Sequence, residues 1–323
     1  MSAELIIGLI GFILAAYSVV ANDAIQTLGT FLASNAKRPW WVLWIYASSI
    51  LVVVLILGWI FYGGDVSYGR LEKFPFPPEG GLQWYYAVPP LAILVLTRLG
   101  IPVSTTFLVL TVFSTGALGS MLTKSLMGYA LALVVGGLVY KTFMKTVEQR
   151  FLGSTNDPPP SYWIVIQWCS TAFLWSQWLI QDLANIYVFL SRPLDPIWLV
   201  LTMMVMVAMQ GVIFYQHGGA IQKIVTSKTN TQDIRSASII DFIYGLILFF
   251  FKQQSNIPMS TTWVFLGLLA GRELALTFDL RMRPMKDTGS LVLRDMGKAL
   301  IGLVVSVILA LLLPFIGRLI SGS

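Results

Sequence analysis

The sequence predicts an all-α polytopic membrane protein, and three observations support this prediction. Of the 323 residues, 56% are hydrophobic and only 11% are charged, which is far from the average of soluble domains. Apolar runs of the length that a membrane helix needs recur along the chain. The strict alternation of apolar and polar residues that is typical of a transmembrane barrel is lacking.

The composition also excludes several classes of function. The net charge of +6 does not indicate a nucleic-acid partner, because the basic residues stand between apolar runs, where they meet lipid headgroups. One cysteine and one histidine exclude a disulfide framework and a Cys/His zinc cluster. No HExxH, GxSxG or P-loop motif is present, so we expect neither an enzyme nor a resident cofactor.

A six-residue motif occurs twice in apolar surroundings. Residues 101–106 read Ile-Pro-Val-Ser-Thr-Thr, and residues 257–262 read Ile-Pro-Met-Ser-Thr-Thr. An amide residue followed by aspartate precedes each copy, at 22–23 and at 181–182. The two dipeptides are 159 residues apart and the two hexapeptides 156. This common order and spacing indicate a duplicated unit.

The duplication predicts two repeats, residues 1–155 and 161–323, joined by a Pro-rich linker at 156–160. Many membrane transporters contain repeats of inverted topology, and paired interruptions of their helices mark the transport site. We therefore expect the first helix to break near Asn22, with loosened backbone lining a cavity. Around each hexapeptide we expect a re-entrant hairpin or two half-helices.

Further spans are expected on both sides of these motifs. In the first repeat they cover residues 5–33, 40–62 and 130–140, with a polar loop at 63–81 and a short apolar run at 84–96. In the second repeat we expect spans at 161–182, 197–215, 239–251 and 299–316, and an aqueous loop at 217–235.

Each hexapeptide is expected to begin a half-helix. Proline is favoured in the first turn of a helix, because it fixes φ and has no N–H. The first free N–H groups and the positive end of the helix dipole then form a cradle for an anion. The alternative is that the hydroxyls only bond the preceding turn or join helices. The hydroxyl donors of the cradle are Ser104, Thr105, Thr106, Ser260, Thr261 and Thr262.

Asp23 and Asp182 are expected to lie beside this cradle and to take part in substrate binding. A carboxylate there repels an anion unless a cation or a proton lies between them. Na⁺ prefers oxygen ligands, which the two carboxylates and the amides of Asn22 and Gln181 can supply. Protonation of the carboxylates is the alternative, and Asp23 could instead cap a helix at the headgroup level.

Two further charged residues are candidates for a gating or accessory role. Asp241 stands in an apolar run, and a solvated helix end is the alternative explanation. Arg98 precedes the first hexapeptide and could pair with an aspartate or attract the substrate. An interfacial arginine that reaches toward the headgroups is the alternative for this residue.

At these residues the chain resembles the inorganic phosphate transporter (PiT) family, whose members are sodium- or proton-coupled symporters. Residues 20–30 read Val-Ala-Asn-Asp-Ala-Ile-Gln-Thr-Leu-Gly-Thr. They match the first Asn-Asp signature of the family at Asn22, Asp23, Gly29 and Thr30. Both hexapeptides match the Pro-x-Ser-Thr-Thr motif that follows each signature in the family.

In the second half, residues 181–185 read Gln-Asp-Leu-Ala-Asn and keep the Asp, the Ala and the second Asn of the signature. The resemblance implies inverted repeats, a phosphate ion at the midplane between the two hexapeptide helices, and cations at the Asn-Asp motifs. The motif positions that would hold cations include Gln26 and Asn185. Departures from the signature at Gln26, Gln181 and Val188 leave room for proton coupling or for sulfate.

We therefore expect an integral, multi-pass transporter, in the plasma membrane of a prokaryote, that moves inorganic phosphate with Na⁺ by alternating access. Proton-coupled transport of sulfate or another oxyanion is an alternative. A membrane sensor that binds the anion without moving it is an alternative of another class. Lipid surrounds such a fold, and a homodimer is common. The sequence does not fix the membrane orientation, because basic residues occur in loops of both halves.

Overall fold

The computed structural model describes residues 2–78, 81–114, 116, 118–154, 159–228, 231–254, 260–280 and 284–321. These residues form helices and turns, and no strand occurs among them. Five of the described helices are long and apolar enough to cross a membrane: Ala3–Ser34, Trp40–Phe61, Leu118–Thr142, Pro196–Tyr215 and Met285–Gly317. The chain is therefore an all-α polytopic membrane protein, as the sequence predicts.

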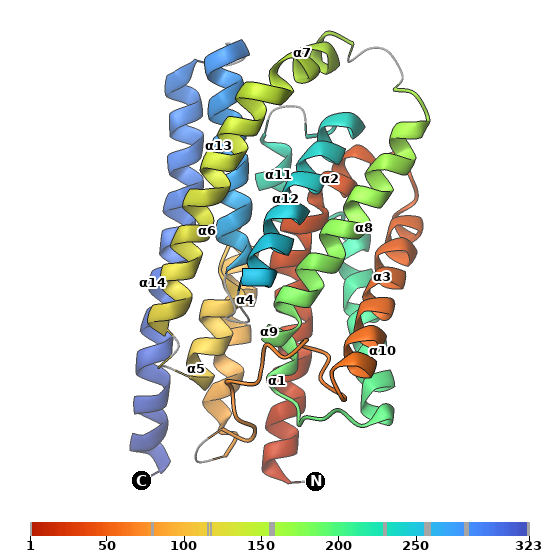
Figure 1. Ribbon diagram of the computed structural model, residues 1–323. Coiled ribbons are helices and arrows are strands. Elements are labelled where there is room, and N and C mark those ends of the chain that lie inside the picture. The colour runs from red at the N-terminus through yellow and green to blue at the C-terminus, as the bar shows by residue number, and fades with distance from the viewer. Residues whose placement is uncertain are drawn as a thin grey trace.

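The first half combines long helices with a cluster of short ones around the first hexapeptide. In chain order its elements are α1 (Ala3–Val19), the π-helical turn η1 (Val20–Ala24), α2 (Ile25–Ser34), α3 (Trp40–Phe61), the 3-10 turn η2 (Trp84–Ala87), α4 (Val88–Arg98), the π-helical turn η3 (Thr106–Leu110), α5 (Thr111–Phe113), α6 (Leu118–Val139), the π-helical turn η5 (Tyr140–Met144) and α7 (Lys145–Gly153). The short helices η3 and α5 end inside the molecule (Figure 1).

The second half has the same kinds of element in a similar order. They are α8 (Tyr162–Asp182), α9 (Ala184–Tyr187), α10 (Pro196–Tyr215), α11 (Gln222–Thr226), α12 (Ile234–Gln254), α13 (Thr261–Leu280) and α14 (Met285–Ser321). In Figure 1, α1 rises from the end where the N-terminus lies, whereas α8 descends toward that end. The helices that carry the two Asp motifs therefore run in opposite directions.

Several element boundaries differ from those expected from the sequence. At Asn22 the backbone stays wound as the π-helical turn η1, because a π-turn accommodates an extra residue without unwinding the helix. The last helix begins at Met285 and not at residue 299, since the end of an apolar run marks the edge of the hydrocarbon and not the end of a helix. Of the predicted linker, residues 156–158 lie outside the described residues.

The two segments predicted as polar loops are partly buried. The segment between α3 and η2 is irregular, as predicted, but Leu71 and Phe74 within it are each only 2% exposed. The segment between α10 and α12 contains the short helix α11, whose Val225 is fully buried. Both segments therefore fold back onto the protein instead of extending into solvent.

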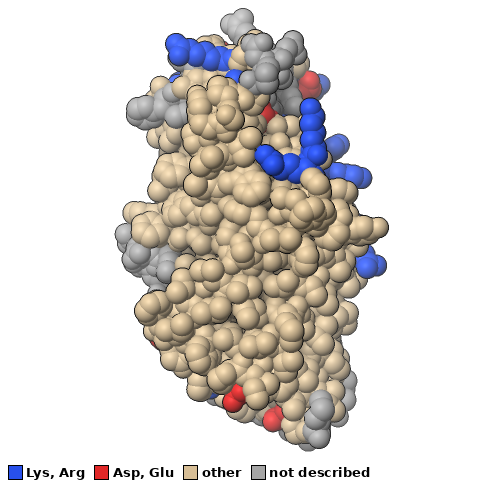
Figure 2. Space-filling model, turned by 90° about the vertical axis from the view of Figure 1, so that its right-hand side faces the viewer, with Lys and Arg blue, Asp and Glu red and all other residues tan. Residues whose placement is uncertain are grey.

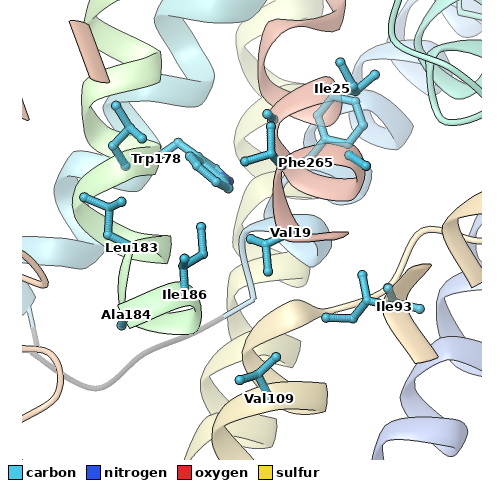
Figure 3. Close-up of a cluster of buried hydrophobic side chains, with 14 of the residues drawn as sticks. Val19, Ile25, Ile93, Val109, Trp178, Leu183, Ala184, Ile186 and Phe265 are labelled. Atoms are coloured by element: carbon cyan, nitrogen blue, oxygen red, sulfur yellow. The ribbon is translucent and has the colours of Figure 1, made fainter. Parts of the chain in front are cut away.

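The apolar core gathers where helices of the two halves meet. Figure 3 shows Val19 and Ile25 from the first half close to Trp178, Ile186 and Phe265 from the second half. All five side chains are buried. In a tightly packed interior, a shift of one helix strains the helices that pack against it. This packing therefore sets the relative position of the two helices that carry the Asp motifs.

Helix α13, which follows the second hexapeptide, packs extensively on α6. A Cβ atom at Gly271 would lie 2.1 Å from the carbonyl oxygen of Leu133, and one at Gly267 would lie 2.4 Å from the carbonyl oxygen of Tyr129. The two glycines have the small-xxx-small spacing that lets membrane helices approach closely. This contact holds α13, and with it the second Ser-Thr-Thr motif.

The two ends of the molecule differ in charge. Figure 2 shows the lysine and arginine side chains of one face gathered toward its upper end. Contacts join basic segments of both halves there. Arg38 lies over the ring of Trp168 at 5.5 Å, and Arg235 donates hydrogen bonds to Ser154 and to the carbonyl of Phe151 at the end of α7. Basic loops that are far apart in the sequence thus share one end of the structure.

We predict that Gly271→Ala destabilises the protein, because the added methyl group presses on the backbone of α6. Overpacking of this kind costs about 1–3 kcal/mol. Gly289→Ala is the matched control, since no described atom lies within 4 Å of a Cβ built there. Thermal unfolding in detergent, followed by tryptophan fluorescence, should show a lower midpoint for the Gly271 variant alone. Equal midpoints for the two variants would contradict the close helix contact.

Candidate functional site

Both Ser-Thr-Thr motifs stand at helix starts, as predicted. Ser104 Oγ accepts a hydrogen bond from the N–H of Phe107 at 3.3 Å, and Ser260 Oγ accepts one from the N–H of Trp263 at 3.3 Å. These are N-cap interactions, each of which satisfies one free N–H group of a helix start. The residues before Ser260 in the second hexapeptide, 257–259, lie outside the described residues.

Asp23 lies between the two helix starts. Its Oδ2 accepts a hydrogen bond from Thr105 of the first hexapeptide, and its Oδ1 accepts one from Thr262 of the second at 3.4 Å. The Asn22 amide also donates to Oδ1, at 2.5 Å. Asp23 is 1% exposed. A carboxylate carried by the first half of the chain is thus enclosed by donors from both halves.

Asp182, in the second half of the chain, has similar surroundings. Its Oδ1 accepts a hydrogen bond from Thr106 at 3.4 Å, and the hydroxyl of Thr261 lies beside it. Asn185 Nδ2 donates to the same oxygen at 2.8 Å and to a hydroxyl of the first hexapeptide at 2.9 Å. Asp23 is close enough to Asp182 for the two charges to repel. Each aspartate therefore meets one threonine from each hexapeptide.

Two oxygen atoms in this buried centre lack a hydrogen-bond partner among the residues that the structure describes. They are Oδ2 of Asp182 and Oδ1 of Asn185. Buried polar atoms are nearly always paired, so these oxygens can receive a cation or a ligand that donates a hydrogen bond. In the first half of the chain, Gln26 is buried and its Nε2 is also unpaired within the same residues, which leaves a donor for an anion.

Asn22 and Gln181, whose amide oxygens are expected cation ligands, make other contacts in the structure. Asn22 Nδ2 donates to the carbonyl of Val103 at 2.7 Å, and its Oδ1 accepts from the N–H of Val103 at 3.3 Å. This amide therefore holds the residue that precedes Ser104. Gln181 Nε2 donates to the carbonyl of Leu248 at 3.1 Å, which ties α8 to α12.

The two accessory candidates lie in different surroundings. Asp241 is fully buried and is not a solvated helix end. Its carboxylate accepts hydrogen bonds from Thr30 on α2 and from Thr171 on α8, the latter at 2.6 Å. Arg98 is exposed at the C-terminal end of α4. The structure thus places Asp241 in the helix packing and Arg98 at the surface.

A buried cation that the sequence did not single out is Arg70, in the segment between α3 and η2. It is 3% exposed, and its Nη1 finds no hydrogen-bond partner within the described part of the chain. Burial lowers the pKa of the guanidinium to about 10, and the charge of Asp182 partly offsets this effect. Arg70 is therefore protonated at neutral pH. A Gly-rich polar segment is typical of a solvated loop, so no local signal marked this arginine.

This fold and site define a class of membrane protein in which two helix starts meet a pair of buried carboxylates. The overall architecture is similar to that of a solved structure described as "The sodium-dependent phosphate transporter". The two superpose with a TM-score of 0.58, and the alignment covers 96% of each chain at 17% sequence identity. The similarity shows a shared fold. No family model matches the chain, and no curated protein matches its sequence.

We predict that Asn22→Ala destabilises the protein in the absence of any ligand, because it removes the amide that binds both the backbone N–H and the backbone carbonyl of Val103. Loss of a buried partner costs on the order of 1–3 kcal/mol. Thr123→Ala is the control, since Thr123 is exposed and bonds only its own helix. Unchanged thermal unfolding of Asn22→Ala would show that this amide does not hold the first hexapeptide.

Proposed function

We propose that this chain is a secondary active transporter that moves inorganic phosphate together with Na⁺ across a membrane. The observation that carries the proposal is the meeting of two capped helix starts, one from each repeat, at a pair of buried carboxylates. The N–H groups and hydroxyls of such starts suit a tetrahedral oxyanion. The fold shared with a sodium-dependent phosphate transporter supports this function.

A cation offsets the repulsion between the anion and the two carboxylates. Asn185 Oδ1, unpaired among the described residues, and the carboxylate oxygens of the centre are ligands of the kind that Na⁺ prefers. Bound cation and bound anion then stabilise each other in one centre, and this mutual stabilisation couples their movement. The membrane potential contributes about 2.3 kcal/mol for each net charge moved through 100 mV.

The same carboxylates favour phosphate over sulfate. Phosphate at neutral pH keeps a proton that it can donate to an acceptor such as Asp182 Oδ2. Sulfate has no proton to donate, so it would face the carboxylate with acceptor oxygens alone. A buried acceptor without a donor is costly, and the centre therefore discriminates between two anions of similar shape.

The arrangement of the two repeats suits alternating access. The helices that carry the Asp motifs run in opposite directions (Figure 1), as in transporters with inverted repeats. Rocking of one repeat against the other would open a shared centre to each side in turn. Because both repeats contribute ligands, the complete centre forms only while the two halves are closed around it.

Asp182→Asn should abolish Na⁺-driven uptake of phosphate into proteoliposomes, because a neutral side chain no longer attracts the coupling cation. Asp287→Asn is the matched control, since Asp287 is exposed at the start of α14. Uptake of radiolabelled phosphate along a Na⁺ gradient measures the effect. Retained Na⁺-dependent uptake in the Asp182 variant would rule out the coupling role.

The wild-type protein in the same assay distinguishes the alternatives. Uptake that responds to a pH gradient and not to Na⁺ would replace sodium coupling with proton coupling. Accumulation of sulfate in preference to phosphate would replace the substrate. Binding of phosphate to purified protein without any uptake would identify a sensor in place of a transporter.

Removing the hydroxyl of Ser104 or of Ser260 should weaken phosphate binding, because each hydroxyl stands at a helix start of the anion site. Glycine variants also free a buried N–H group at each helix start, so binding is measured on protein that thermal unfolding shows to be folded. We expect Ser104→Gly and Ser260→Gly to lower affinity about tenfold. Ser49→Ala, at an exposed position of α3, is the control. Wild-type affinity in both glycine variants would count against the anion site.

A further inference from the structure

Arg70 is held in the interior by a tightly bonded turn. Asp65 starts this turn, and its Oδ1 accepts a hydrogen bond from the N–H of Ser67 at 2.8 Å while its Oδ2 accepts one from the N–H of Gly69 at 3.0 Å. Tyr68 has a φ of 58°, and its hydroxyl donates to a carbonyl of α3 at 2.7 Å. A tyrosine whose backbone is held in the left-handed conformation by several contacts is typical of a functional segment.

The same segment is fixed to the chain that follows Asp182. Arg192 donates hydrogen bonds to the carbonyl of Leu71 at 3.1 Å and to the carbonyl of Phe74 at 2.5 Å. In Figure 1 the segment is the orange loop that passes below α9. These bonds tie the segment with Arg70 to the chain that follows α9, and the charge of Asp182 acts on Arg70.

Arg70 and Asp182 carry opposite charges that act on each other. Among the described residues, no salt bridge joins Arg70 to Asp182. In the same part of the chain, Nη1 of Arg70 and Oδ2 of Asp182 each lack a hydrogen-bond partner. Buried atoms of this kind rarely stay unpaired. A ligand that accepts from the guanidinium and donates to the carboxylate would satisfy both atoms. A tetrahedral oxyanion that carries a proton has both properties.

We propose that Arg70 binds the oxyanion directly and, together with Asp182, selects an oxyanion that carries a proton. The guanidinium donates to anion oxygens in charge-assisted hydrogen bonds, and the hydroxyl group of the anion donates to Asp182 Oδ2. Phosphate and arsenate meet this requirement, whereas sulfate does not. The inference rests on the proposed function, since it adds a residue and a selection rule to the same centre.

Two lysines extend the positive charge from Arg70 toward the surface. Lys124, half-buried on α6, is within electrostatic reach of both Arg70 and Lys73, and Lys73 is exposed. Lys124 is near the start of α6, which in Figure 1 lies at the end of that helix farther from α7. Charges of one sign along a path concentrate ligands of the opposite sign, so an anion that arrives at this end is drawn toward Arg70.

Equilibrium binding of radiolabelled phosphate to purified protein, in detergent with Na⁺, tests this proposal. Arg70→Gln should weaken binding by about tenfold or more, because charge-assisted hydrogen bonds are lost. Arg70→Lys should weaken it less, since the charge stays but the guanidinium geometry does not. Arg294→Gln removes an exposed arginine of α14 and should bind as the wild type does. Unlabelled arsenate should compete with phosphate, and sulfate should not.

Thermal unfolding with and without phosphate separates ligand binding from a structural role. A ligand raises the unfolding midpoint of the state that binds it. In Arg70→Gln, we expect this increase to disappear while the ligand-free midpoint is not lowered. If the ligand-free midpoint falls and Asp182→Asn restores it, Arg70 is a counter-ion of Asp182 and the proposal is wrong.

The outcomes also distinguish a failure of the role of Arg70 from a failure of the proposed phosphate transport. Wild-type protein that binds phosphate, together with Arg70→Gln that binds it equally well, would overturn the role of Arg70 alone. Wild-type protein that binds no phosphate would overturn the proposed function and the role of Arg70 with it. Equal competition by sulfate and arsenate would overturn the selection rule.

Discussion

Two buried carboxylates whose charges repel each other are the constraint on which the rest of the structure depends. Asp23 and Asp182 are each about 1% exposed, and like charges at such depth are unfavourable unless donors or cations surround them. Hydroxyls from both hexapeptides and the Asn185 amide bond to the pair, and the charge of Arg70 acts on Asp182. Because these groups come from both halves, neither half can form the centre alone, and the centre suits a cation and an anion bound together.

The same constraint explains why helices begin inside the molecule. Backbone N–H groups cannot be left free in hydrocarbon, and irregular backbone at that depth must be buried in protein. Ser104 and Ser260 cap the two internal starts, and the Asn22 amide binds the peptide before one of them. The close approach of α6 to α13 at Gly271 supports the other start from outside. Packing around the centre thus serves its polar groups as well as the apolar core.

The meeting of the two Asp motifs with the two hexapeptides could be predicted from the sequence, because both motifs occur twice. Their matched order and spacing imply that the two copies pack against each other in similar ways. The helix starts could be predicted because Pro followed by Ser has strong local preferences. Arg70 could not, because a Gly-rich polar segment resembles a solvated loop until its long-range bonds to Arg192 are known. The burial of Asp241 depends on threonines that lie far away in the sequence. The same holds for Asn22, whose partner Val103 no local pattern identifies.

The unequal charge of the two ends has a consequence for how the chain lies in a bilayer. Arg38, the end of α7 and Arg235 belong to the basic end of the structure, and basic loops are retained on the cytoplasmic side of membranes. Both chain termini lie at the opposite end (Figure 1), so we infer that they face outward. The turn that carries Arg70, which lies below α9 in Figure 1, is then on the exterior side of the buried centre.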